Sequence, residues 1–214
     1  MNVIDTLKHF SLVPVVAINN SSDAEGLAEA LISGGLPLAE ITFRTEAAEN
    51  SIRTITAHFP EMSVAAGTVL SSDQADRAID AGASLIVSPG LNPTVVEHCL
   101  NRGYPVVPGI VTPSEIELAL SFGLKYLKFF PAEASGGIRM IKALSAPYSD
   151  VRFMPTGGIG PENLADYLSN EKVFACGGSW MVKGTLINER KFNEIELLTK
   201  DAVRIVNNLR RQEF

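Results

Sequence analysis

The chain has 214 residues, of which 46% are hydrophobic, and its formal net charge is −6. A chain of this length and composition can bury a full core, and we expect a single domain over residues 1–214. The composition argues against a membrane-spanning protein, because no apolar run approaches the necessary length, and the scattered Lys and Arg residues argue against a nucleic-acid partner.

Two features bear on the cellular compartment. The first ten residues include Asp5, Lys8 and His9 and lack the apolar segment of a secretory signal. The cysteines, Cys99 and Cys176, are too few for a disulfide scaffold and lack the spacing of metal ligands. Both observations favour a cytoplasmic protein with reduced thiols.

Short β-rich runs alternate with amphipathic, helix-like segments along the chain. We expect strands at Val13–Ile18, Ala39–Phe43, Val64–Gly67, Leu85–Ser88, Val106–Pro108, Tyr126–Phe130, Arg152–Pro155 and Val173–Cys176. We expect helices at Asp23–Ser33, Glu46–Phe59, Ser72–Ala81, Pro93–Arg102, Pro113–Ser121, Gly137–Leu144, Pro161–Leu168 and near Asn193–Arg210. This alternation is typical of parallel strands joined by helical crossovers.

Eight strand–helix units in a chain of this length predict an α/β fold, a small (β/α)8 TIM barrel. The first ten residues would add an extra N-terminal helix that covers the base of the barrel. The alternative is a doubly wound open sheet. Asn19-Asn20-Ser21-Ser22 follows the first expected strand, where a dinucleotide-binding sheet would carry Gly-x-Gly-x-x-Gly, and this favours the barrel.

The most informative residue is Lys128, which lies inside the apolar run Tyr126–Pro131. An ammonium group is costly to remove from water, and burial lowers the pKa of a lysine because it penalises the charged form. A neutral amine can condense with a ketone to form a Schiff base. The alternative is an edge-strand lysine whose amine reaches solvent.

Charged residues on a second strand favour the first interpretation. Alternation along the expected strand Ala39–Phe43 places Glu40, Thr42 and Arg44 on its inward face. A glutamate and an arginine there could form a structural ion pair. If Lys128 also faces inward, three charges converge at the carboxyl ends of the strands, where barrels place their active sites.

Other strand ends carry groups suited to a ligand. The third and fourth expected strands lead into Thr68 and Pro89, and the last two lead into Thr156–Gly158 and Gly177–Ser179. Glycine pairs let backbone N–H groups approach a ligand closely, and barrels often bind phosphate after strands seven and eight. A helix N-terminus beside them would add a positive dipole. We therefore expect an anionic, phosphorylated small molecule as the ligand.

The three histidines and the cysteines do not contribute to this pattern. His9, His58 and His98 fall on expected helices, away from the strand ends. The sequence has no cluster with metal-ligand spacing, so we expect neither a metal site nor a cofactor. Ser179 has no plausible histidine partner, which argues against a serine-hydrolase triad.

Together these segments resemble a known family, the class I aldolases that split 2-keto-3-deoxy-6-phosphogluconate (KDPG) and 4-hydroxy-2-oxoglutarate (KHG). The matching segments, in family order, are Glu40–Glu46, Ala66–Leu70, Ser88–Gly90, Leu127–Glu133, Pro155–Ile159 and Gly177–Trp180. The resemblance implies a carbon–carbon lyase of carbohydrate metabolism that works in the Entner–Doudoroff pathway as a homotrimer. One departure is Gly160, where serine is common in the family, and it would weaken a helix cap by a few tenths of a kcal/mol.

The resemblance also implies residue roles. Lys128 would be the Schiff-base lysine, and Glu40 would be the general acid/base. The implied substrate contacts are Arg44 and Thr68 with the carboxylate, Pro89 and Phe130 with the pyruvate portion, and Thr156, Gly157, Gly158 and Ser179 with the distal hydroxyl and phosphate.

Two other functions are compatible with the residues. A phosphosugar isomerase could use the phosphate site without an imine, and a non-catalytic barrel could bind a keto-acid phosphate. The choice among KDPG, its galactonate epimer and KHG stays open, because these substrates share the pyruvate half. Stereochemistry at C4 and the extent of oxaloacetate decarboxylation also stay open.

Overall fold

The computed structural model describes residues 2–212, and short parallel strands alternate with helices throughout this range. The strands are β1 (Leu12–Val16), β2 (Leu38–Thr42), β3 (Ser63–Gly67), β4 (Leu85–Val87), β5 (Val106–Val107), β6 (Gly109–Ile110), β7 (Tyr126–Phe129), β8 (Arg152–Pro155) and β9 (Cys176–Gly178). The α-helices are α1 (Val3–Phe10), α2 (Ala24–Ser33), α3 (Ala48–His58), α4 (Ser72–Asp80), α5 (Pro93–Asn101), α6 (Pro113–Ser121), α7 (Gly137–Ser145), α8 (Leu164–Leu168), α9 (Gly184–Asn188) and α10 (Phe192–Gln212). Short 3-10 helices are η1 (Ser21–Asp23), η2 (Glu133–Ser135) and η3 (Trp180–Val182).

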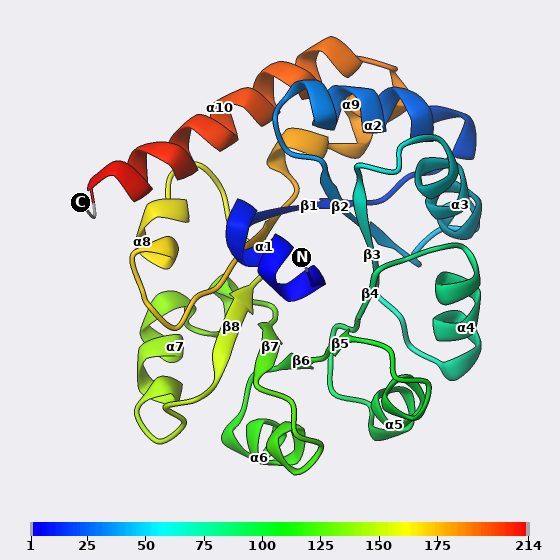
Figure 1. Ribbon diagram of the computed structural model, residues 1–214. Coiled ribbons are helices and arrows are strands. Elements are labelled where there is room, and N and C mark those ends of the chain that lie inside the picture. Colours follow the sequence, from blue (N-terminus) through cyan, green and yellow to red (C-terminus); the bar gives the residue numbers. More distant parts are fainter. Residues whose placement is uncertain (1, 213–214) are drawn as a thin grey trace.

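The strands pair in parallel in two groups, a curled six-stranded sheet of order β5-β4-β3-β2-β1-β9 and a three-stranded sheet of order β6-β7-β8. Figure 1 shows the strands arranged around α1, with the other helices outside them. The α/β class is therefore confirmed. Where the sequence predicts one closed eight-stranded barrel, the regular pairing is interrupted at two places.

The first interruption is at Pro108, where the expected strand Val106–Pro108 ends: β5 covers Val106–Val107, and β6 follows beyond the expected strand at Gly109–Ile110. Proline has no N–H to donate to a neighbouring strand, so the ladder breaks there. At the second, β8 and β9 are joined by isolated parallel bridges, Phe153 with Val173 and Thr156 with Gly177. The predicted bounds of the last strand, Val173–Cys176, are wrong, because β9 begins only at Cys176 and ends at Gly178.

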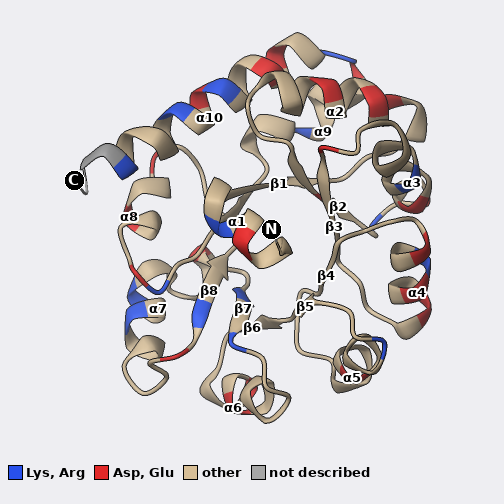
Figure 2. Cartoon of the chain, viewed as in Figure 1, with Lys and Arg blue, Asp and Glu red and all other residues tan. Residues whose placement is uncertain are grey.

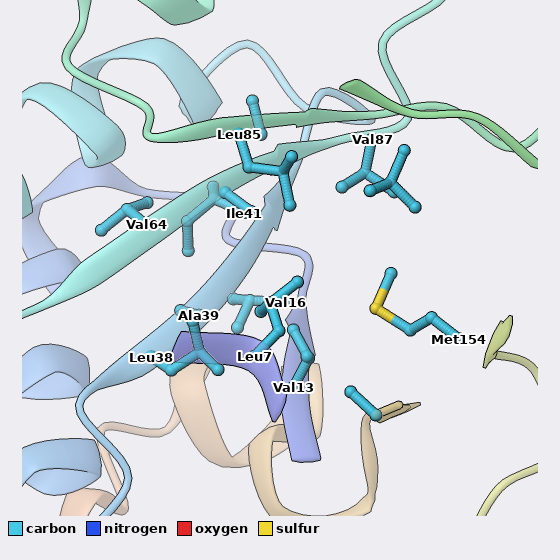
Figure 3. Close-up of a cluster of buried hydrophobic side chains, with 14 of the residues drawn as sticks. Leu7, Val13, Val16, Leu38, Ala39, Ile41, Val64, Leu85, Val87 and Met154 are labelled. Atoms are coloured by element: carbon cyan, nitrogen blue, oxygen red, sulfur yellow. The ribbon is translucent and has the colours of Figure 1, made fainter. Parts of the chain in front are cut away.

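The core is apolar at the base of the sheet, where α1 covers the strand ends. Leu7 of α1 is buried with Val13 of β1, Leu38 of β2 and Met154 of β8 in one hydrophobic cluster, part of which Figure 3 shows. The expected N-terminal helix is α1, and its amphipathic sequence explains why it lies here. This apolar base leaves the opposite, carboxyl ends of the strands for polar side chains.

The outer helices carry the charges. Figure 2 shows acidic and basic residues interspersed on these helices, α4 and α10 among them. The long helix α10 packs along α2 and also contacts α8 and α9. Of the helices in residues 2–212, none is both long enough and apolar enough to cross a membrane.

Helix α6 begins with a capping box at Thr112 and Glu115. The Glu115 carboxylate accepts hydrogen bonds of 2.8 Å from the Val111 and Thr112 backbone N–H groups and from the Thr112 hydroxyl. Partial burial raises the pKa of Glu115, but these hydrogen bonds outweigh it and hold the pKa below its ordinary value of 4.5.

A depressed pKa means that the ionised Glu115 stabilises the folded chain above pH 4.5, and that this contribution is lost as the pH falls through the folded-state value. We expect Glu115→Gln to lower the free energy of unfolding by about 1 kcal/mol at neutral pH. The difference from wild type should shrink in acid, as urea titrations at several pH values would show. Glu97→Gln, which changes an exposed carboxylate on α5, is the matched control and should show no such convergence.

Candidate active site

A cavity of about 380 Å³ opens at the carboxyl ends of the strands. Its lining residues are Val15, Glu40, Thr42, Arg44, Thr68, Pro89, Lys128, Phe130, Thr156, Gly157, Gly158, Ile159, Gly177, Gly178 and Ser179. All ten residues that the sequence singles out as catalytic or substrate-binding are in this set. Their convergence is confirmed, while their individual roles stay predictions.

The centre of the cavity is a contact between Lys128 of β7 and Glu40 of β2. Lys128 Nζ donates a hydrogen bond of 2.9 Å to Glu40 Oε1. The two residues are 4% and 0% exposed, so bulk water does not solvate either head group. The solvent-exposed lysine of the alternative interpretation is therefore wrong for this chain.

One acceptor of this pair has no protein partner. Glu40 Oε2 is buried and accepts no hydrogen bond from the residues that the structure describes. An unpaired buried carboxylate oxygen costs free energy unless a ligand or water meets it. Because Glu40 lines the cavity, a substrate hydroxyl or a water molecule can supply that partner.

Strand alternation explains why Lys128 reaches this point. Tyr126, two residues earlier, lies at the opposite end of the interior, where its hydroxyl accepts a 2.8 Å hydrogen bond from Lys8 of α1. Phe130, two residues later, lines the cavity, and its ring centroid lies 5.5 Å from Lys128 Nζ. The ring and Pro89 supply an apolar wall beside the amine.

Glycines at three strand positions make room for the polar groups. A Cβ at Gly67 would lie 2.2 Å from Glu40 Oε1, and one at Gly177 would lie 2.4 Å from Thr156 Oγ1. A Cβ at Gly109 would lie 2.0 Å from the Pro89 carbonyl oxygen. These positions therefore exclude any larger side chain as long as the neighbours keep their places.

Arg44 lies at the rim and is held by a residue to which the sequence gives no role. Thr42 donates its hydroxyl proton to the Val16 carbonyl oxygen at 2.7 Å and accepts a 3.2 Å hydrogen bond from Arg44 Nε. Since Nε is occupied, the two terminal nitrogens form the free edge of the guanidinium. Thr68, with a φ of 57°, lines the same side of the cavity.

The segment after β8 borders the distal end of the cavity. Three of its carbonyl oxygens accept hydrogen bonds: Thr156 from Ala132 N at 2.8 Å, Gly157 from Glu133 N at 3.1 Å, and Gly158 from Asn163 Nδ2 at 2.9 Å. Thr156 Oγ1 is buried and without a hydrogen-bond partner among the described residues. The Thr156 hydroxyl is thus available to a ligand at this end.

The expected helix start beside this segment is wrong by three residues. Helix α8 begins at Leu164, and Pro161–Asn163 form a turn instead. The Gly160 N–H donates a 2.9 Å hydrogen bond to Asn163 Oδ1, and this bond stabilises the turn. Gly160 is therefore not the helix cap that the family comparison suggested.

Two of the three histidines lie away from the cavity and form hydrogen bonds with acidic side chains. His58 contacts Glu25 at 2.6 Å, and His98 contacts Asp76 at 2.8 Å. Burial raises the pKa of the Cys99 thiol to about 11 and also raises the pKa of Cys176, which disfavours thiolate chemistry. Within residues 2–212 no group of three or more His, Cys, Asp or Glu residues is placed to hold a metal ion.

The sequence interpretation assigned no role to four residues at or near the cavity: Val15, Thr42, Ile159 and Asn163. Strand alternation places Thr42 inward, but nothing in the sequence shows that it holds Arg44. Asn163 could not be found in the same way, because it acts through a turn whose conformation no periodic pattern specifies.

Known proteins share both the sequence and the fold. Residues 3–198 match the family model for KDPG and KHG aldolase. A 2-dehydro-3-deoxy-phosphogluconate aldolase of Haemophilus influenzae is 46% identical over 204 residues, which cover 95% of this chain and 96% of that protein.

Two solved structures are similar over nearly the full length. The KDPG aldolase of Legionella pneumophila, with pyruvate captured as a covalent carbinolamine intermediate, has a TM-score of 0.90 at 34% identity and covers 94% of this chain and 98% of its own. The KDPG aldolase of Zymomonas mobilis ZM4, with 3-phosphoglycerate, has a TM-score of 0.88 at 37% identity and covers 94% and 95%. This chain belongs to the KDPG and KHG aldolase family.

Proposed function

We propose that the protein is a class I, Schiff-base aldolase that cleaves KDPG to pyruvate and glyceraldehyde 3-phosphate. The observation that carries this proposal is the buried 2.9 Å contact between Lys128 Nζ and Glu40 Oε1 inside the strand-end cavity. It combines an amine nucleophile with a carboxyl group that can take and return protons.

The contact supplies a route to a reactive amine. Transfer of one proton from Lys128 Nζ to Glu40 Oε1 leaves both buried groups uncharged. The amine then attacks the C2 ketone of the substrate, and a proton passes from the new ammonium to the alkoxide to give the carbinolamine. The carbinolamine loses water as Glu40 returns its proton to the departing hydroxyl. The product is a protonated iminium on Lys128.

The iminium accepts electrons when the C3–C4 bond breaks. Glu40 takes the proton of the C4 hydroxyl, the C3–C4 electron pair moves into an enamine, and glyceraldehyde 3-phosphate leaves. The same carboxylic acid then protonates C3, and water hydrolyses the resulting iminium to pyruvate and free Lys128. A positioned carboxyl group of this kind contributes roughly 10²–10⁴-fold to the rate.

The pyruvate half is held by side chains. Arg44 and Thr68 bind the carboxylate, and Pro89 and Phe130 pack against the C2–C3 portion. The Arg44 guanidinium presents its two terminal nitrogens because Thr42 occupies Nε, and this edge suits a bidentate grip on a carboxylate. Such a grip fixes the ketone for attack by the amine.

The distal half is held mainly by backbone. Gly157, Gly158 and Ser179 bind the phosphate, and the Thr156 hydroxyl forms a hydrogen bond with the distal hydroxyl of the substrate. The related Zymomonas mobilis enzyme was solved with 3-phosphoglycerate, a phosphorylated three-carbon acid, which supports a phosphate site in this family. The free hydroxyl of Thr156 supports a polar substrate at this end.

The same chemistry extends to KHG, which would yield pyruvate and glyoxylate. The pyruvate half of KHG is identical to that of KDPG, and the family model covers both activities. The phosphate site favours KDPG. Comparing kcat/KM for KDPG, its galactonate epimer and KHG ranks the three.

We also propose that residues 1–214 form one domain in which the two sheets close into a single (β/α)8 barrel. In support, β5 continues into β6 across Pro108, and two parallel bridges join β8 to the strand that contains β9. Family membership supports a homotrimer that works in the cytoplasm in the Entner–Doudoroff pathway. No nucleic acid, membrane, metal or cofactor takes part in the proposed reaction.

The first prediction is the site of Schiff-base formation. Borohydride with pyruvate should inactivate the enzyme and leave a reduced pyruvyl adduct on Lys128, as peptide mass analysis would show. Lys125→Gln, which removes an exposed lysine three residues away, should retain the adduct. An adduct on another lysine, or none, would contradict the mechanism and favour the isomerase or the binding barrel.

The second prediction separates imine formation from cleavage. Glu40→Gln keeps a hydrogen-bond acceptor near Lys128 but removes the proton carrier. We expect borohydride still to trap pyruvate on Lys128, more slowly than in wild type because water must then take the Lys128 proton, while kcat for KDPG falls roughly 10²–10⁴-fold. A coupled lactate dehydrogenase assay measures the fall, and unchanged turnover would remove Glu40 from the scheme.

The third prediction concerns the space that Gly67 leaves. Gly67→Ala places a Cβ against Glu40 Oε1 and displaces the carboxyl group. We expect kcat/KM to fall about a hundredfold, as a displacement of about 1 Å can produce. Gly184→Ala is the control, because nothing lies within 4 Å of a Cβ there, and it should retain wild-type activity.

A further inference from the structure

The carbonyl oxygens of Thr156, Gly157 and Gly158 point away from the cavity. Three successive carbonyls accept hydrogen bonds from Ala132 N, Glu133 N and Asn163 Nδ2, none of which belongs to a cavity-lining residue. These hydrogen bonds fix the orientation of three peptide groups, those that join Thr156 to Gly157, Gly157 to Gly158 and Gly158 to Ile159.

The N–H directions follow from peptide geometry. In a planar trans peptide the oxygen and the amide hydrogen point to opposite sides. The N–H groups of Gly157, Gly158 and Ile159 therefore point away from the groups that bind the carbonyls, and all three residues line the cavity. Within residues 2–212 the Gly158 and Ile159 N–H groups donate to no other protein group, while the Gly157 N–H lies beside the parallel bridge of Thr156 with Gly177.

Successive free N–H groups form a concave site that attracts anions. The backbone at Gly157 and Gly158 has φ values of +100° and +79°, which glycine adopts without strain. The third donor, Ile159 N–H, is not one of the site residues that the sequence indicates. Its direction depends on the Gly158 carbonyl.

Asn163 is the side chain that holds this carbonyl. Its Nδ2 donates to Gly158 O at 2.9 Å, and its Oδ1 accepts from Gly160 N at 2.9 Å. One amide group thus joins both sides of Ile159. The other two carbonyl contacts use backbone donors of Ala132 and Glu133, which a substitution would not remove.

We propose that Asn163 is a positioning residue that sets the preference for a phosphorylated over an unphosphorylated substrate. It does so by holding the Ile159 N–H toward the phosphate. The inference rests on the proposed aldolase function, and it concerns the distal half of the substrate only. Asn163 touches neither Lys128 nor Glu40, so imine formation does not depend on it.

The test is Asn163→Asp, which keeps the shape and the acceptor for Gly160 N but replaces the donor with a carboxylate oxygen. Repulsion between that oxygen and the Gly158 carbonyl frees the peptide to turn. We expect kcat/KM for KDPG to fall roughly ten- to a hundredfold, the value of one hydrogen bond to a charged group. KHG cleavage and borohydride trapping with pyruvate should stay at wild-type rates.

Asn170→Asp is the matched control. Asn170 lies on the next turn, outside the cavity, and only its Oδ1 is used, as an acceptor from Lys172 N. This variant should keep both the KDPG and the KHG rates.

Asn163→Ala separates loss of the donor from added negative charge. The KDPG-to-KHG ratio of kcat/KM should fall in this variant too, and inorganic phosphate should inhibit KHG cleavage more weakly than in wild type. A fall in the Asp variant alone, or an equal loss for both substrates, would overturn the positioning role. Wild-type enzyme that fails to form pyruvate from KDPG would instead refute the proposed function.

Discussion

The structure depends on one buried contact, between the amine of Lys128 and the carboxyl group of Glu40. Taking both groups out of water costs free energy that their attraction only partly offsets, and an apolar pair of the same volume would serve the fold as well. The reason for the contact therefore lies in chemistry. In the proposed reaction a proton moves between the two groups without leaving a net buried charge, and the amine becomes a nucleophile inside the cavity.

The cavity around this contact arises from a change in side-chain size along the strands. At the base, Leu38 of β2 and Met154 of β8 fill the interior together with Leu7 of α1. Toward the carboxyl ends the inward-facing residues have polar side chains, as at Thr42, or no side chain, as at Gly67. Glycine weakens a strand and offers nothing to pack, so its presence there is explained by the Glu40 carboxyl group that occupies its space.

Much of this arrangement could be predicted from the sequence, because two-residue alternation and strand–helix order are periodic signals. They place Glu40, Thr42 and Lys128 correctly on the inward face. Local backbone chemistry accounts for the errors. Strand pairing resumes as β6 beyond Pro108, where the sequence predicts the strand to end, and β9 starts later than its apolar run suggests. Asn163 was missed because its role depends on a non-periodic turn.

In the proposed function the two halves of the cavity recognise the substrate by different means. Glu40 of β2 and Lys128 of β7 lie at the end assigned to pyruvate, and their positions are set by buried strands. Backbone N–H groups border the distal end, and their directions are set by a turn that a few hydrogen bonds hold. Since the reacting bonds lie at the strand-built end in this proposal, the aldehyde half of the substrate can differ without any change in the position of Lys128. A division of this kind explains how one imine site can serve both phosphorylated and unphosphorylated substrates.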